Sequence, residues 1–304
     1  MKFFLASIII AATSTAWTAE TIIIRSPVDH NHAGNPALQI IIAAANQGQN
    51  QYTFMMTQNP GGQGTVALGK VDPQKDLALI HPSFVQNSVS GAVQEKNWIP
   101  VGALGDACFL LISQQGDAAQ GISSLEKSTV PLMVGVVGLG SASHLLALEI
   151  SAVIGIYIEP VMFKSAGQAV LNLIAQPELT MALGNINQFR TAHSKKPTAT
   201  ALGALCSARH PDMPETRTFQ EQGINTPLVF NILVAHTDMA PAKRQQIKEI
   251  WDRAVKTVGK DRIFAVSGFI SPHFDQTSID EYARQRIATM RSALEKHKDQ
   301  VTAK

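Results

Sequence analysis

The residues best suited to chemistry surround a short glycine-rich turn. Gly138 and Gly140 interrupt an apolar run, and Ser141, Ser143 and His144 follow directly. This pattern predicts a buried strand, a tight turn and a helix capped near Ser141 or Ser143. A helix start presents unpaired backbone N–H groups and the positive end of its dipole, which together favour an anion. We therefore expect this turn to bind a carboxylate of a ligand.

Other kinds of site fit this turn less well. It lacks the third glycine of a dinucleotide-binding fingerprint, and no Gly-Lys-Ser/Thr follows as in a phosphate-binding loop. The Gly-x-Ser-x-Gly of a hydrolase nucleophile elbow is also absent. A plain strand-to-helix turn, in which a serine only caps the helix, stays an alternative. For His144 the alternative is a buried, hydrogen-bonded imidazole.

A second strand–loop–helix unit lies near the N-terminus. The strand covers residues 20–25, a polar loop runs from Ser26 to Asn35, and a helix capped by Asn35 continues to about residue 46. The loop holds Asp29, His30 and His32, but two histidines separated by one residue, with no distant third partner, are a poor zinc signal. We expect no metal, and either a hydrogen-bonding mouth for a carboxylate or a solvated loop.

Further polar residues follow other predicted strands. Ser83 comes after the strand at residues 77–80, Lys164 and Ser165 open a helix after a strand, and Asn185 follows the strand at residues 179–183. Lys164 offers a positive charge and Asn185 both a donor and an acceptor. The alternatives are a surface lysine and ordinary turn chemistry.

The alternation of strands and helices predicts an α/β fold with a mostly parallel sheet in each domain. Ligands of such folds bind at the carboxyl ends of the strands, where these polar residues fall. We therefore expect the binding site in a cleft between two α/β domains.

Composition sets the outer limits of function. The chain has 304 residues, and 45% of them are hydrophobic. This length exceeds what a single hydrophobic core usually supports and predicts two domains. A net charge of +2 and only 6% aromatic residues argue against nucleic-acid binding. Two cysteines, Cys108 and Cys206, fit either a disulfide or two separate buried thiols.

The N-terminus has the pattern of an export signal. A cationic start is followed by the apolar run 3–12, which is too short to span a bilayer. The small residues Ser14 and Ala16 favour cleavage after Ala16, and cleavage after Ala19 fits less well because it would place bulky Trp17 three residues back. An uncleaved anchor at the membrane surface is the alternative. We expect residues 1–19 to be a signal peptide and the mature protein to be periplasmic.

The order of these motifs resembles that of the substrate-binding proteins of the tripartite tricarboxylate transporter family, the periplasmic receptors of the TctC or Bug type. The resemblance covers nearly the whole mature chain. It is carried by the glycine turn at 137–144, the Phe-Lys-Ser-Ala-Gly-Gln-Ala segment at 163–169, the loop at 59–64 and the segment 201–223.

The resemblance implies a two-domain periplasmic-binding-protein architecture that closes on a small carboxylate. Domain 1 would comprise residues 20–105 and 227–304, and domain 2 residues 106–226. It also implies delivery of the ligand to a two-subunit membrane permease. Ligand contacts would come from the first strand–helix loop, the loop near Ser83, the central glycine turn and the loop after the strand at residues 179–183. The candidate ligand-binding residues are Ser26, Asn31, His32, Gly34, Asn35, Ser83, Gly138, Gly140, Ser141, Ser143, His144, Lys164, Ser165 and Asn185.

Two departures from the family pattern bear on the ligand. The first loop lacks the usual Pro-Gly-Gly and acidic residue, and Gly184 stands where the family often has an aspartate before Asn185. Because that acidic residue can receive an ammonium group, its loss favours a carboxylate without an amine. We expect a monomer with no cofactor, no metal and no catalytic residues.

Two alternative functions use the same sequence features. One is a receptor of the same fold that signals through a membrane sensor. The other is a secreted hydrolase that would use Ser141 or Ser143 with a histidine, for which the chain has no nucleophile elbow, carboxylate pair or metal-ligand set.

Overall fold

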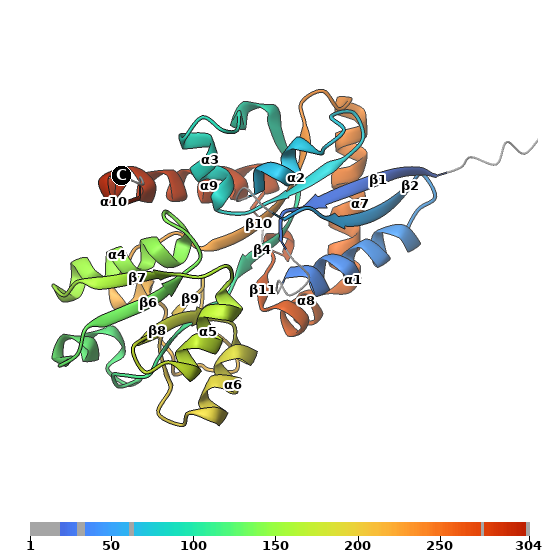
Figure 1. Cartoon of the computed structure of the whole chain (residues 1–304). Helices are drawn as coiled ribbons and strands as arrows, with labels where there is room; N and C mark the ends of the chain where they lie inside the picture. The colour runs from blue at the N-terminus through green and yellow to red at the C-terminus, as the bar shows by residue number, and fades with distance from the viewer. Residues whose placement is uncertain (1–18, 29–33, 61–63, 275–276, 302–304) are drawn as a thin grey trace, which may run out of the picture.

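The computed structural model describes residues 19–28, 34–60, 64–274 and 277–301. It contains two lobes, each built on one β-sheet with helices packed against it (Figure 1). The predicted signal peptide lies outside the described residues apart from its last position, and so do Asn31 and His32. Within the described ranges, no helix has the length and apolar character needed to cross a membrane.

Lobe 1 is built from both ends of the chain. Its sheet has the strand order β11-β4-β10-β3-β1-β2. The strands are β1 (Glu20–Ser26), β2 (Tyr52–Gln58), β3 (Leu77–Ile80), β4 (Trp98–Ala107), β10 (Val229–His236) and β11 (Phe269–Ile270). The helices are α1 (Gly34–Gln47), α2 (Thr65–Gly69), α3 (Ser83–Val89), α7 (Pro241–Val258), α8 (Lys260–Ser267), α9 (Ile279–Lys296) and α10 (Lys298–Val301).

Helices cover both faces of the lobe 1 sheet. Leu38 of α1 and Trp251 of α7 belong to the apolar cluster on one face. Phe84 of α3 and Met290 of α9 belong to the cluster on the other. The indole of Trp251 lies so close to β4 that a Cβ at Gly102 would come within 2.3 Å of it. Glycine at position 102 therefore permits the contact between α7 and the sheet.

Lobe 2 is formed by one continuous part of the chain. Its sheet has the order β7-β6-β8-β5-β9, with β5 (Phe109–Ser113), β6 (Leu132–Val136), β7 (Ile158–Met162), β8 (Met181–Gly184) and β9 (Thr200–Leu205). The helices are α4 (Ala142–Ile154), α5 (Ala166–Ala175) and α6 (Ile186–Lys195). As expected for a strand that contains Pro160, β7 lies at the edge of this sheet.

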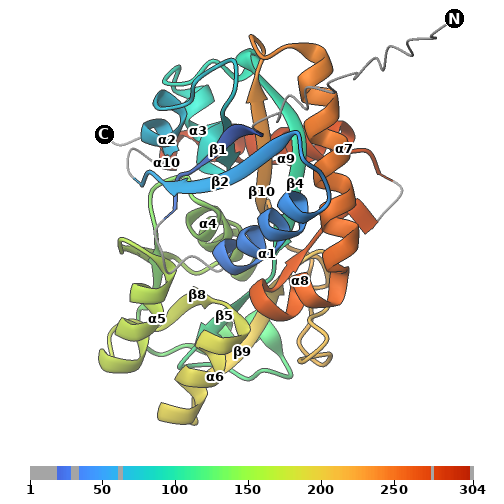
Figure 2. The same cartoon turned by 90° about the vertical axis from the view of Figure 1, so that its right-hand side faces the viewer.

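The chain crosses between the lobes on adjacent paths that run in opposite directions (Figure 2). β4 continues into β5, and β9 leads back through residues 206–228 to β10. Because the return path runs opposite to the outgoing one, β10 pairs antiparallel with β4 and β9 antiparallel with β5. The predicted α/β fold is confirmed. The prediction of mostly parallel sheets is wrong, because only β2-β1-β3 and β7-β6-β8 pair in parallel.

Side-chain caps mark the starts of α4 and α9, and the first of these is the start predicted near Ser141. Ser141 caps α4 and Ser278 caps α9, each accepting a hydrogen bond from a backbone amide three residues later. The prediction that Asn35 caps α1 is wrong by a residue or two, because the helix begins at Gly34. Helices α3 and α6 were not predicted from the sequence. The first has only seven residues, and the second is polar and buries only Ala192.

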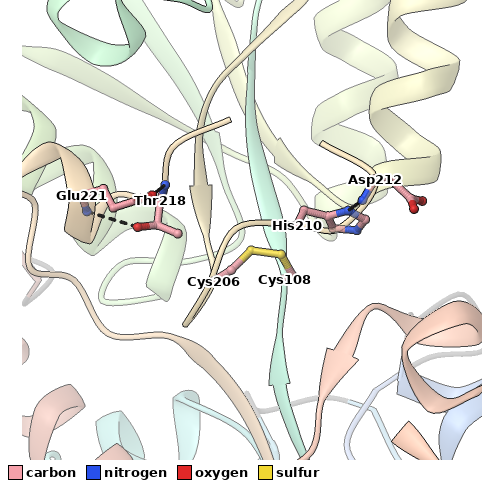
Figure 3. Close-up of a disulfide and its surroundings, with 6 residues drawn as sticks. All are labelled: Cys108, Cys206, His210, Asp212, Thr218 and Glu221. Atoms are coloured by element: carbon pink, nitrogen blue, oxygen red, sulfur yellow. Dashed lines mark hydrogen bonds between the residues drawn. A yellow bond between two sulfur atoms is a disulfide. The ribbon is translucent and has the colours of Figure 1, made fainter. Parts of the chain in front are cut away.

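Cys108 and Cys206 form a disulfide, which resolves the alternatives left open by the sequence. Cys108 lies where β4 passes into β5, and Cys206 follows β9, so the bond joins the outgoing and returning paths (Figure 3). The backbone amide of Cys108 also donates to the carbonyl of Gly268 in lobe 1, at 3.1 Å. Nearby, the ring of His210 packs against Phe264 of α8, with ring centroids 5.0 Å apart. The disulfide therefore stabilises the junction of the two lobes.

Loss of the disulfide should lower stability. The two cysteines are 98 residues apart in sequence, and a cross-link over so long a loop typically contributes about 2–4 kcal/mol. We expect Cys108→Ala/Cys206→Ala to lower the free energy of unfolding by about this amount in urea titrations. A reductant should destabilise the wild type to a similar extent and leave the double variant unaffected. Equal stability of reduced and oxidised wild type would contradict this.

Acid should destabilise the protein before its carboxylates titrate. Burial lowers the pKa of the imidazoles of His144, His210 and His273 below the usual value. Protons then bind the unfolded chain more tightly, so stability should fall as pH drops below about 6.5. Urea unfolding at pH 7.5, 6.5 and 5.5 would measure this. His144→Asn, which keeps a hydrogen-bond acceptor, should show a shallower decline, and equal slopes would exclude a contribution from His144.

Candidate functional site

A cavity of about 410 Å³ lies between the two lobes, where the sequence analysis predicts the site. Lobe 1 and the crossing strands line it with Pro27, Val28, Pro60, His81, Pro82, Ser83, Phe109 and Val229. Lobe 2 lines it with Val137, Ser141, Ala142, Ser143, Lys164, Ser165, Ala166 and Leu183. Polar side chains thus meet mainly apolar walls in a space of the size typical of small-molecule pockets.

The first polar wall is the N-terminus of α4. Ser141 is its cap, and its Oγ accepts the backbone N–H of His144 at 3.3 Å. The hydroxyls of Ser141 and Ser143 lie 3.0 Å apart, and Ser143 Oγ also accepts the amide of Val137. A hydroxyl proton and the positive end of a helix of 13 residues therefore lie at the cavity wall.

The second polar wall is the N-terminus of α5. Ser165 caps this helix by accepting the amide of Gln168, and Lys164 stands directly before it. Lys164 is exposed, and it is the one lysine or arginine among the described residues that line the cavity. Two helix N-termini and an ammonium group thus make the lobe 2 side of the cavity electropositive.

Lobe 1 contributes an imidazole that the sequence analysis did not include. His81 follows β3, and its Nδ1 accepts the backbone amide of Ser83 at 3.3 Å and lies 3.0 Å from Ser83 Oγ. An imidazole whose Nδ1 accepts carries its proton on Nε2 when neutral. The signal was available, because His81 directly follows the apolar strand at residues 77–80.

Several predicted site residues lie outside the lining of the cavity. Ser26 is buried at the end of β1, and Gly34 and Asn35 are buried at the start of α1. Gly138 and Gly140 form the turn behind Ser141. Asn185 caps α6 in a capping box with Gln188, which agrees with the alternative of ordinary turn chemistry given for this residue. Direct ligand contact by these residues stays a prediction.

His144 lies beneath the glycine turn, with 2% of its surface exposed. Its Nδ1 accepts the backbone amide of Gly140 at 3.0 Å, so this nitrogen is engaged in holding the turn. Burial, and then the nearby His297, lower the pKa of His144, which keeps the ring neutral and able to accept. Gly140 has φ 70°, a left-handed conformation that favours glycine.

The described residues contain no cluster of three or more histidines, cysteines or carboxylates that could hold a metal ion. The polar groups at the cavity are hydroxyls, backbone amides, an imidazole and an ammonium group. All of these can donate hydrogen bonds, and such a donor-rich site suits an anionic ligand with an apolar body.

Comparison by sequence finds no matching family model and no matching curated protein. Comparison by structure finds many similar proteins. A TctC solute binding protein from Polaromonas is 14% identical over 92% of this chain and 99% of that one, with a TM-score of 0.69. MatC from Rhodopseudomonas palustris with bound malate is 17% identical over 91% and 98%, with a TM-score of 0.69. Another R. palustris protein, with adipate, is 15% identical over 93% and 97%, with a TM-score of 0.71.

These similarities extend over almost the full length of both partners, although few residues are identical. The periplasmic binding protein BugD is a further example, with a TM-score of 0.70. The resemblance inferred from the motif order is therefore confirmed at the level of structure. The chain has the fold of the TctC- and Bug-type solute-binding proteins.

Proposed function

We propose that this protein is an exported receptor that binds a small organic carboxylate reversibly in the cavity between its lobes. The observation that carries the proposal is the cavity itself, in which Ser141 and Ser165, the caps of two helices, lie with Lys164 opposite His81 and Ser83 of lobe 1. The malate and adipate held by two similar structures are small dicarboxylates, which is consistent with this chemistry.

The energetics require contacts from both lobes. Micromolar binding needs about 8 kcal/mol. One helix dipole contributes about 0.3–1 kcal/mol, and a hydrogen bond to a charged group roughly 1.5–3 kcal/mol. The glycine turn alone therefore provides too little binding free energy for micromolar affinity. Hydrogen bonds from both lobes together would reach it. Binding would then favour the arrangement that brings the lobes together.

Export and delivery are the finer parts of the proposal. The Cys108–Cys206 disulfide fits an oxidising compartment such as the periplasm, in keeping with the signal-like N-terminus. Delivery to a two-subunit permease of the tripartite tricarboxylate type follows from the resemblance. A signalling receptor of the same fold is the alternative, and a pulldown from membranes would distinguish a permease from a sensor.

Ligand binding is tested first with a panel of mono-, di- and tricarboxylates and amino acids. We expect at least one acid without an amine to raise the melting temperature and to bind in calorimetry, while amino acids do not. A well-folded protein that binds no acid would overturn the proposal. Parallel hydrolysis assays with an ester panel test the hydrolase alternative, for which turnover lost in Ser141→Ala or Ser143→Ala would be required.

A negative charge at the cap of α4 should weaken ligand binding without unfolding the helix. Aspartate caps helices as well as serine does, so Ser141→Asp should keep the melting temperature of the wild type. Its carboxylate would repel a ligand carboxylate, and we expect affinity to fall at least about tenfold. The matched control is Ser278→Asp at the cap of α9, which should leave affinity unchanged. Equal affinities of the two variants would place the ligand elsewhere.

The charge of Lys164 should contribute to affinity. Because the side chain is exposed, its hydrogen bond to a carboxylate is partly screened, and we expect Lys164→Gln to weaken binding about 3- to 10-fold. Lys195→Gln, at an exposed position of α6 outside the cavity lining, is the control. The difference in affinity between the wild type and Lys164→Gln should become smaller in high salt, and calorimetry at two salt concentrations would detect this.

A further inference from the structure

Helix α4 is buried on two sides, by its own lobe and by lobe 1. Leu146 and Ile150 pack into the apolar core of lobe 2. Leu145 and Leu148 instead belong to the lobe 1 cluster that includes Leu294 of α9. The helix that presents Ser141 to the cavity is therefore enclosed between the lobes, beside α9 and α10 (Figure 1).

A hydrogen bond from lobe 1 reaches the glycine turn itself. Gln86 Nε2 donates to the carbonyl oxygen of Leu139 at 2.7 Å. The fit is close, because a Cβ at Gly140 would lie 3.0 Å from Gln86 Nε2 and 3.1 Å from Leu294 Cδ2. Gln86 follows the cavity residue Ser83 by three positions, so both lie on one side of α3.

A second set of contacts joins the middle of α4 to the end of α9. The carboxylate of Glu149 accepts hydrogen bonds from Lys296 Nζ at 2.7 Å and His297 Nε2 at 2.8 Å. Its side chain is only 8% exposed. Burial by itself would raise the pKa of Glu149, but the hydrogen bonds from Lys296 and His297 outweigh it and lower the pKa. Lobe 1 thus contacts both the turn before α4 and the body of the helix.

We propose that Gln86 is a positioning residue of the ligand site, acting across the lobes through the carbonyl of Leu139. It fixes the glycine turn against α3, and so sets Ser141 and Ser143 relative to Ser83 across the cavity. Widening the cavity on this side breaks the Gln86–Leu139 bond, so the bond slows ligand release. This inference rests on the proposed function, because it assigns Gln86 a role in binding the same carboxylate.

The test compares three substitutions that separate the donor from the bulk of the side chain. Gln86→Ala removes both, and Gln86→Glu keeps the shape but presents an acceptor to a carbonyl. Gln86→Lys keeps a donor long enough to reach it. We expect the first two to weaken binding of the acid found in the panel about 3- to 10-fold, mainly through faster release, and Gln86→Lys to restore most of the affinity.

The matched control is Ser88→Ala on the same helix. Ser88 donates to Glu95, a contact within lobe 1, so its loss should leave the affinity unchanged. Hydrogen exchange of the ligand-free protein supplies a readout without ligand. The amides of residues 138–141 should exchange faster in Gln86→Ala and Gln86→Glu, but not in Gln86→Lys or Ser88→Ala.

Wild-type affinity and unchanged exchange in all three Gln86 variants would overturn the inference. Equal weakening in Gln86→Lys and Gln86→Ala would also overturn it, since the donor would then not matter. If the wild type binds no acid, the proposed function fails separately, and the exchange result alone decides whether Gln86 positions the turn.

Discussion

The structure depends on the antiparallel pairing of β4 with β10. This pairing spans the whole of β10, from Val229 opposite Ala107 to His236 opposite Trp98. It keeps the outgoing and returning paths of the chain side by side at the centre of lobe 1. The lobe 1 sheet extends on both sides of this pair, and the lobe 2 sheet extends from β5 alone, because β9 is its edge strand. Phe109 and Val229, near the junction of the lobes, line the cavity. The cleft is thus a direct result of how the strands cross.

Ionic and hydrogen-bonded contacts reinforce this junction from the α9 side. Asp106, near the end of β4, accepts hydrogen bonds from the hydroxyl of Tyr282 at 2.7 Å and from Arg286 Nε at 2.8 Å. A buried carboxylate is costly unless it is paired, and here both partners come from α9. Together with the disulfide, this network holds the end of β4 in place while α9 extends across to α4. The position of α4, and so of its capping serine, is fixed from the same helix that anchors the crossing.

Much of the fold is predictable from local chemistry. Ser141, Ser278 and the proline at the start of α7 mark helix starts by mechanisms that act within a few residues, and the structure has these starts. The cavity contains Ser83, Ser141, Ser143, Lys164 and Ser165 because residues after strands gather at one edge of a sheet. The antiparallel direction of the crossing strands was not predicted, since strand direction depends on partners far away in sequence.

The interactions between the lobes are the hardest features to predict from the sequence. The apolar residues of α4 surround the helix, a pattern of burial on all sides, but nothing local identifies α3 and α9 as the second neighbours. Gln86 belongs to a seven-residue helix that has no detectable period, and its partner is a backbone carbonyl with no sequence signature. His81 could have been found from its place directly after the strand at residues 77–80, whereas the role of Gln86 emerges only once α3 and the glycine turn are placed together in space.

The discontinuous assembly of lobe 1 has a consequence for the order of folding. All strands of lobe 2 lie between residues 109 and 205, so its sheet can form from one uninterrupted stretch. The lobe 1 sheet needs β10 between β3 and β4, and its core needs Trp251 and Met290, which come late in the chain. During synthesis, β1, β2 and β3 therefore lack their neighbour β10 until the last quarter of the polypeptide begins to emerge.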